Sequence, residues 1–220
     1  MTETKAKPQI STGLMQKLVD RTARVGVIGM GYVGLPTMVA VADGGFNVTG
    51  IDLAEDRVVS INNGSSYVED VADTTLSPLV ASDKISATTD FKAVRDLDVI
   101  LVCVPTPITK NKEPDLKPLE NAVSQLADHM ASDQLVVLQS TTFPGTTQEI
   151  VLPKLEQNGL EVGKDFYLAF ALERIDPGNQ THVLRNVPKV VGGVTPECSR
   201  IATYFFSAFV DQVIPVSSPK

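Results

Sequence analysis

Cysteine and histidine are scarce in this chain of 220 residues, which contains two of each. Cys103 and Cys198 are far apart and isolated in the sequence, so we expect neither a disulfide framework nor a cysteine metal site. His129 and His182 are also isolated, and we interpret both as surface or helix-end side chains. The sequence therefore predicts no bound metal.

Basic clusters and long apolar runs are absent as well. The formal net charge is −7 and no basic block occurs, which argues against nucleic acid as a partner. No apolar run approaches the roughly 20 residues of a membrane span, and the first nine residues lack the apolar core of a signal peptide. We therefore expect a cytoplasmic protein whose partners include neither nucleic acid nor a membrane.

Apolar residues make up 43% of the chain, enough for a large core. Short apolar runs, typical of buried strands, alternate with segments of helical character. This alternation predicts an α/β fold with a Rossmann-like, doubly wound, mainly parallel sheet of about eight strands flanked by helices. We expect an N-terminal extension at 1–22, one domain of this fold at 23–216, and the start of a linker at 217–220.

Two segments depart from the simple alternation. Residues 65–83 are predicted to form an irregular acidic insertion with one or two helical turns near 76–81, either a plain surface excursion or a cover for the edge of a ligand site. Residues 11–21 predict a short amphipathic helix.

Pro153 lies inside the helix that begins near Pro144, so we expect a kink or break there.

A glycine-rich turn follows the first predicted strand of the domain, and it has the order and spacing of a dinucleotide-binding unit. Gly29 permits a tight turn, Gly31 lets a pyrophosphate approach the backbone, and Gly34 lets the next helix pack closely on the strand. Tyr32 and Val33 belong to the same turn and are expected to contact the cofactor. The N-terminus of the following helix offers N–H groups to the phosphates.

The second apolar run ends in Asp52, 23 residues after Gly29. A carboxylate at this spacing would accept hydrogen bonds from the ribose hydroxyls, whereas a 2′-phosphate would be repelled, so NAD is the expected cofactor and not NADP. Arg57 leaves two alternatives open, since its guanidinium could meet a phosphate or lie along the adenine.

Three later segments follow strands and should reach the same carboxyl edge of the sheet, where ligands bind in such folds. They supply the remaining expected cofactor contacts, which are Val104, Pro105, Thr106, Ser140 and Thr141. Glu173 and Arg174 follow the strand at 166–170 in a loop stiffened by proline and glycine, which is typical of a site loop. Cys103, inside an apolar strand, is interpreted as a core residue.

Six motifs in this order resemble the nucleotide-sugar 6-dehydrogenases, the UDP-glucose/GDP-mannose dehydrogenase family, over roughly residues 22–220. They are GMGYVGLP at 29–36, GID at 50–52, CVPTP at 103–107, EPD at 113–115, STTFPGTT at 140–147 and ERIDPGN at 173–179. The details are most similar to the UDP-N-acetylglucosamine 6-dehydrogenase branch.

The resemblance implies oxidation of a UDP-sugar C6 alcohol to a carboxylate with two NAD molecules, through a thioester on a cysteine. It gives Glu173 the role of acid/base carboxylate and Thr141 that of a hydroxyl that helps to position water, with Glu173 and Arg174 contacting the substrate. The chain departs from the family at Ala171-Leu172, where Ser-Pro or Asn-Pro is usual.

The resemblance also implies a homodimer for the full-length protein, and it places the catalytic cysteine, in a Gly-Gly-His-Cys stretch, beyond Lys220 together with the active-site lysine and asparagine. Two alternatives stay open. The chain could bind NAD without turnover, or it could belong to another Rossmann dehydrogenase that acts on hydroxy acids or acyl substrates. The second alternative explains the glycine turn but not the later motifs.

Overall fold

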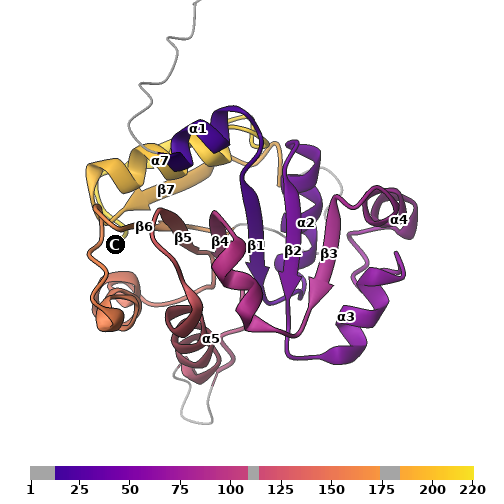
Figure 1. Ribbon diagram of the computed structural model, residues 1–220, viewed down its shortest axis with the longest axis horizontal. Helices are drawn as coiled ribbons and strands as arrows, with labels where there is room; N and C mark the ends of the chain where they lie inside the picture. Colours follow the sequence, from indigo (N-terminus) through magenta and orange to yellow (C-terminus); the bar gives the residue numbers. More distant parts are fainter. Residues whose placement is uncertain (1–12, 109–113, 174–183) are drawn as a thin grey trace, which may run out of the picture.

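A computed structural model gives the fold and describes residues 13–108, 114–173 and 184–220. Within these ranges, eight strands form one sheet in the order β3-β2-β1-β4-β5-β6-β7-β8 (Figure 1). This order confirms the predicted doubly wound α/β fold, with its reversal between β1 and β4. The strands are β1 (Arg24–Ile28), β2 (Asn47–Ile51), β3 (Ile85–Thr88), β4 (Val99–Val102), β5 (Gln134–Leu138), β6 (Phe166–Ala171), β7 (Lys189–Gly193) and β8 (Val213–Val216).

The sheet is mainly parallel, and one pairing departs from this pattern. Strands β1 to β6 pair in parallel, whereas β7 pairs with β6 in the antiparallel sense and β8 is parallel to β7. An antiparallel neighbour can follow without a crossover helix. Because β7 reverses direction, the amino end of β7 lies beside the carboxyl end of β6, which brings Lys189 to the edge where ligands are expected.

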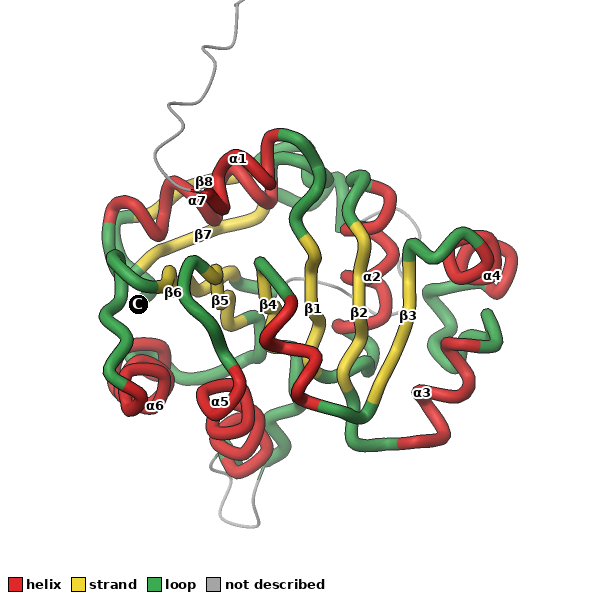
Figure 2. The backbone as a smooth tube through the Cα atoms, in the orientation of Figure 1, coloured by secondary structure: helices red, strands yellow, loops and turns green. Residues whose placement is uncertain are grey.

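Helices cover both faces of the sheet (Figure 2). One buried cluster joins one face to residues of α1, α2, α3, α4 and α7. A second cluster joins the other face to η1, α5 and α6. The helical elements are α1 (Gly13–Val19), α2 (Gly34–Asp43), α3 (Glu55–Asn62), α4 (Asp73–Ala81), η1 (Phe91–Asp96), α5 (Lys117–His129), η2 (Thr147–Val151), α6 (Leu152–Leu155), η3 (Glu156–Asn158) and α7 (Pro196–Phe206).

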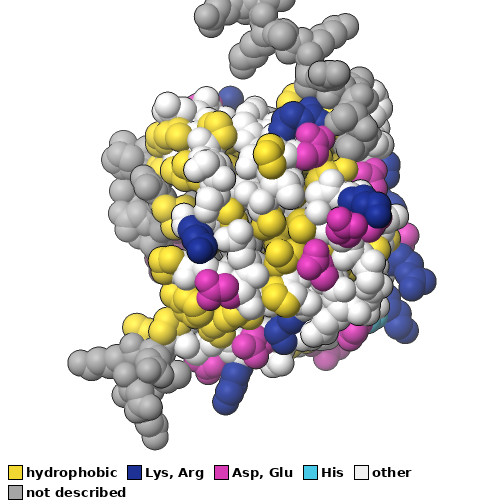
Figure 3. Space-filling model, turned by 90° about the vertical axis from the view of Figure 1, so that its left-hand side faces the viewer, with side chains coloured by type: hydrophobic (Ala, Val, Ile, Leu, Met, Phe, Trp, Pro, Cys, Tyr) yellow, Lys and Arg dark blue, Asp and Glu magenta, His cyan; other side chains and the backbone are white. Residues whose placement is uncertain are grey.

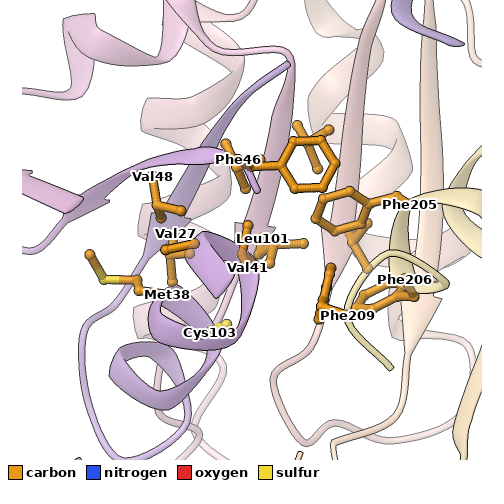
Figure 4. Close-up of a cluster of buried hydrophobic side chains, with 14 of the residues drawn as sticks. Val27, Met38, Val41, Phe46, Val48, Leu101, Cys103, Phe205, Phe206 and Phe209 are labelled. Carbon is orange, nitrogen blue, oxygen red and sulfur yellow. The ribbon is translucent and has the colours of Figure 1, made fainter. Parts of the chain in front are cut away.

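Burial on both faces of the sheet explains why the sequences of these strands are continuous apolar runs. All four residues of β4 are buried, with Val99 and Leu101 in one cluster and Ile100 and Val102 in the other. Four phenylalanines close the first cluster at the α7 end, with ring centroids 5.2 to 5.6 Å apart (Figure 4); they are Phe46, Phe205, Phe206 and Phe209. The rigid centre of the sheet thus fixes the positions of the loops at its carboxyl edge.

The predicted N-terminal helix is present as α1, and polar contacts attach it to the domain. The Leu14 N–H donates to Asp133 Oδ2 at 2.9 Å, and the Lys17 ammonium lies 2.6 Å from Asp98 Oδ1. Asp98 also accepts the Arg24 N–H at 2.7 Å. The described part of the predicted extension therefore packs on the fold.

Two further predictions can be compared with the structure. The helical part of the acidic insertion is longer than expected, since α4 forms nine residues from Asp73 and contains Pro78. Around Pro153, where we expect a kink or break, the helix changes type without a gap: the π-helical turn η2 comes before the proline, α6 contains it, and η3 follows directly. None of the helices in the described ranges is long and apolar enough to cross a membrane.

Candidate functional site

A cavity of about 500 Å³ lies at the carboxyl ends of β1, β2, β4 and β5, where the strand order reverses. This is the crevice where open α/β sheets bind ligands, and its volume is ordinary for a ligand site. Its wall contains every residue predicted to bind the cofactor except Gly34. The lining residues are Ile28, Gly29, Gly31, Tyr32, Val33, Ile51, Asp52, Leu53, Arg57, Phe91, Cys103, Val104, Pro105, Thr106, Pro118, Asn121, Ala122, Gln125, Gln139, Ser140 and Thr141.

The three glycines of the turn meet different surroundings. Gly29 has a φ of 90°, and a Cβ there would come within 2.9 Å of the Cys103 carbonyl oxygen. A Cβ on Gly34 would overlap the Gly29 carbonyl oxygen, so this glycine lets α2 pack against the turn. A Cβ on Gly31 would meet nothing within 4 Å. The fold itself therefore requires Gly29 and Gly34, whereas the space beside Gly31 is open to the cavity.

Asp52 follows β2 and has a side chain that is 11% exposed. Its Oδ2 accepts the Met30 N–H at 2.8 Å, and its Oδ1 accepts the Ala54 N–H at 3.0 Å. The Arg57 guanidinium lies 3.3 Å from the same Oδ2. These contacts hold the carboxylate at the wall of the cavity in one orientation, which suits an acceptor for ribose hydroxyls.

Tyr67 belongs to the acidic insertion and contacts the glycine turn. Its hydroxyl donates to the Met30 carbonyl oxygen at 2.6 Å, and the Arg57 guanidinium lies 5.7 Å from its ring centroid. Burial raises the pKa of Tyr67 to about 12, with Arg57 lowering it and Asp52 and then Asp56 raising it. The hydroxyl is therefore a neutral donor at physiological pH, and the insertion packs against the turn.

The loops after β4 and β5 meet across the cavity. The Thr106 hydroxyl donates to the Thr141 carbonyl oxygen at 2.5 Å. The Ser140 N–H donates to the Val102 carbonyl oxygen at 3.1 Å, which continues the pairing of the two strands beyond their ends. The structure thus brings together the loops that the sequence placed at one edge.

Glu173 lies beneath this wall and does not line the cavity. Its side chain is 8% exposed, and its Oε2 lies 2.7 Å from the ammonium of Lys189, which is 5% exposed. The Gln139 amide donates to the same oxygen at 3.1 Å, and the Lys189 ammonium lies 5.4 Å from the Phe206 ring centroid. A buried ion pair with a neutral donor therefore fixes the predicted acid/base carboxylate.

Cys103 extends this buried network toward the cavity. Its Sγ lies 3.6 Å from Gln139 Oε1, and the side chain is almost fully buried. Burial raises the pKa of the thiol to about 12; Glu173 raises it further, and Lys189 lowers it. A thiol of this kind is protonated at neutral pH, which agrees with the prediction that Cys103 is a core residue.

The sequence did not single out several residues of the site. Lys189 could have been found as the one charge in an apolar strand, and Gln139 as the polar residue that directly follows β5. Asn121 and Gln125, spaced by four on α5, both face the cavity, and this spacing was also readable.

Two other predictions remain, one about Arg174 and one about bound metal. Arg174, predicted to contact the substrate, lies outside the described residues. Over the described ranges, no group of three or more His, Cys, Asp or Glu side chains could hold a metal ion.

Comparison with known proteins agrees with this geometry. Residues 23–210 match the model of the NAD-binding domain of the UDP-glucose/GDP-mannose dehydrogenase family. The chain is 37% identical to Protein CapL of Staphylococcus aureus over 84% of its own length and 43% of that protein. It is 31% identical to a UDP-N-acetyl-D-glucosamine 6-dehydrogenase of Pseudomonas aeruginosa, over 85% and 44%.

A solved structure is similar over the same region. The UDP-D-ManNAc dehydrogenase of Pyrococcus horikoshii superposes with a TM-score of 0.84 at 31% identity, over 89% of this chain and 47% of that one. The chain thus spans less than half the length of the relatives named here. It belongs to the UDP-glucose/GDP-mannose dehydrogenase family, and residues 23–210 are the NAD-binding domain.

Proposed function

We propose that this chain is the NAD-binding part of an enzyme that oxidises the C6 alcohol of a UDP-sugar, a UDP-N-acetylhexosamine, to the uronate with two NAD molecules. The observation that carries the proposal is the cavity at one sheet edge that is lined by the glycine turn, Asp52 and the two hydroxyl-bearing loops. The relatives named as dehydrogenases of UDP-N-acetyl sugars support this substrate class.

The residues present fit NAD. The open space beside Gly31 would take the pyrophosphate, and the oriented carboxylate of Asp52 would accept the ribose hydroxyls. Arg57, which is paired with Asp52, would lie at the adenosine end of NAD. There it would not repel the ribose hydroxyls. The loops with Thr106, Ser140 and Thr141 would flank the nicotinamide side. When bound, NAD supplies a hydride acceptor.

Glu173 and Thr141 are the proposed catalytic residues of this chain. Thr141 is part of the cavity wall, where its hydroxyl would hold water or substrate, and its loop is held by Thr106. The carboxylate of Glu173 is held by Lys189 and Gln139, so proton transfer at Glu173 would be relayed to the cavity only after a local shift of this cluster. Glu173 and Arg174 are proposed to contact the sugar.

We also propose that the full-length protein is a homodimer. A broad group of hydrophobic side chains lies on the face seen in Figure 3, which is the left-hand side of Figure 1. The edge strand β8 carries two of the exposed apolar residues, Ile214 and Val216. A face of this kind supports burial against more protein.

The full-length gene product tests the proposed activity. NADH formation at 340 nm is measured with UDP-N-acetylglucosamine, UDP-N-acetylmannosamine, UDP-glucose and GDP-mannose. We expect the N-acetylhexosamines to be oxidised with two NADH per sugar. No reduction with any of the four sugars contradicts the proposal, and a stoichiometry of one NADH per sugar contradicts the complete oxidation to the uronate.

A second candidate function is NAD binding without turnover by the 220-residue chain alone. The observation that favours it is the state of the two cysteines: Cys103 is a buried thiol with a high pKa, and Cys198 is fully buried in α7. A protonated thiol is a poor nucleophile toward an aldehyde, and Cys198 does not line the cavity. Oxidation of any of these sugars by the 220-residue chain would contradict this candidate.

A further inference from the structure

The peptide groups on both sides of Met30 are held from different elements. Its N–H donates to Asp52 Oδ2 at 2.8 Å, and its carbonyl oxygen accepts the Tyr67 hydroxyl at 2.6 Å. Asp52 follows β2, whereas Tyr67 lies in the segment between α3 and α4. A residue of the acidic insertion therefore touches the centre of the glycine turn.

The contact with the Met30 carbonyl oxygen also affects the next residue. The Met30 carbonyl and the Gly31 N–H belong to one planar peptide group, so fixing the oxygen fixes the direction of that N–H. Gly31 lines the cavity, and N–H groups of such turns bind phosphates. The Tyr67 hydroxyl thus contacts the peptide group that precedes a residue of the cavity wall, although Tyr67 is not itself part of that wall.

The ring of Tyr67 makes a second contact, with the guanidinium of Arg57. The Arg57 guanidinium lies 5.7 Å from the ring centroid and 3.3 Å from Asp52 Oδ2, and it lines the cavity. The ring and the carboxylate together confine an arginine whose side chain is 44% exposed. The hydroxyl thus contacts the peptide group before Gly31, and the ring contacts Arg57.

We propose that Tyr67 is a positioning residue for the dinucleotide, which orients the Met30–Gly31 peptide through its hydroxyl and Arg57 through its ring. This inference rests on the proposed function, since it requires that the chain binds NAD.

Two substitutions separate the two contacts. Tyr67→Phe removes the hydroxyl and keeps the ring, whereas Tyr67→Leu removes both. Tyr204→Phe is the matched control, because Tyr204 is a partly buried tyrosine on α7 that does not line the cavity. Thermal unfolding of each variant, followed by titration well below its midpoint, ensures that only folded protein is compared.

Binding of NAD, ADP-ribose and adenosine is then measured. Loss of one neutral hydrogen bond predicts that Tyr67→Phe binds NAD and ADP-ribose about three- to tenfold more weakly, while adenosine affinity stays within about twofold. Tyr67→Leu should weaken adenosine as well. In the free protein, the amide resonance of Gly31 should move in Tyr67→Phe and stay in place in Tyr204→Phe, because Gly31 shares its peptide group with the Met30 carbonyl.

Three results would contradict the proposal or its basis. If the parent binds NAD and Tyr67→Phe binds it equally well, the positioning role is overturned and NAD binding stands. An equal loss for ADP-ribose and adenosine in Tyr67→Phe also overturns it, since general loosening of the fold would act on both ligands. A parent chain that does not bind NAD at millimolar concentration overturns the proposed NAD binding, and the positioning role with it.

Discussion

Two regions at the same sheet edge are built in opposite ways. Around the glycine turn, backbone groups make most of the contacts, and the side chains of Asp52 and Arg57 reach the cavity. Around Glu173, the charged side chains of Glu173 and Lys189 are buried against each other, and the cavity is lined by their neighbours Gln139 and Cys103. We call these the turn region and the buried-pair region. The ligand-facing groups of the first region line the cavity, whereas the ion pair of the second region does not.

The difference indicates which function each region can perform in this chain. The turn region holds its ligand-facing groups in place with partners from within residues 29–67. The buried-pair region instead holds a carboxylate that cannot reach the cavity without moving from Lys189 or Gln139. Binding therefore depends on the turn region, and the proposed chemistry depends on a rearrangement of the buried pair.

The largest expected effect is on the buried pair. Lys189→Met removes the ammonium that lies 2.7 Å from the buried Glu173 carboxylate, so we expect a loss of about 3–5 kcal/mol in the free energy of unfolding, measured in urea. The double variant Lys189→Met/Glu173→Gln should recover most of this loss. Lys164→Met is the control, because the Lys164–Glu161 pair is exposed and is expected to contribute at most about 1 kcal/mol. Equal losses for Lys189→Met and Lys164→Met would contradict the account.

The next effect concerns packing in the turn region. Gly34→Ala places a methyl group against the Gly29 carbonyl oxygen, and we expect a loss of about 3 kcal/mol in the free energy of unfolding. Gly31→Ala is the control, since its methyl group would meet nothing within 4 Å. If Gly34→Ala unfolds at the same thermal midpoint as the parent, α2 does not pack closely on the turn at this position.

The charge of Asp52 should affect how tightly the cofactor binds. Asp52→Asn removes a charged acceptor, so we expect NAD affinity to fall about 10- to 100-fold and the preference for NAD over NADP to shrink. Asp56→Asn makes the same change of charge four residues later at an exposed position outside the cavity, and it should leave both affinities nearly unchanged. Calorimetric titration with the two cofactors measures both effects. An unchanged NAD/NADP ratio in Asp52→Asn would remove Asp52 from cofactor selection.

The smallest effect tests how closed the buried-pair region is. The pKa of Cys103 is raised to about 12, so the thiol carries its proton up to that pH and loses it only above. Between pH 7 and 9 we therefore expect almost no reaction of Cys103 in the folded chain with a disulfide reagent, and reaction of both thiols in denaturant. A rate at Cys103 that rises steeply between pH 7 and 9 would mean that this region is open to solvent.

The two regions also differ in how far the sequence predicts them. The glycine turn was readable because the requirements at Gly29, Gly31 and Gly34 arise within one short segment, where spacing reflects backbone geometry. The doubly wound sheet was readable for a similar reason, since each buried strand is a local apolar run. The placement of the loops with Val104 and Ser140 at one edge followed from the parallel order of the strands.

Contacts between distant segments were not predictable in the same way. The pairing of Lys189 with Glu173 depends on the antiparallel return of β7, which apolar patterning does not encode. The contact of Tyr67 with Met30 joins positions 37 residues apart, and the insertion that carries Tyr67 contains no periodic pattern that points to the turn. Such contacts arise only when the packed sheet fixes where the loops end.

The central claim is that the cavity at the turn region of this chain binds NAD, and titration of NAD into the parent chain and Gly31→Ala tests it most directly. We expect one NAD site in the parent, equal thermal midpoints for the two proteins, and at least about tenfold weaker binding by Gly31→Ala, because the methyl group would occupy the space open to the pyrophosphate. Equal binding by Gly31→Ala, or no binding by the parent at millimolar NAD, would contradict the claim.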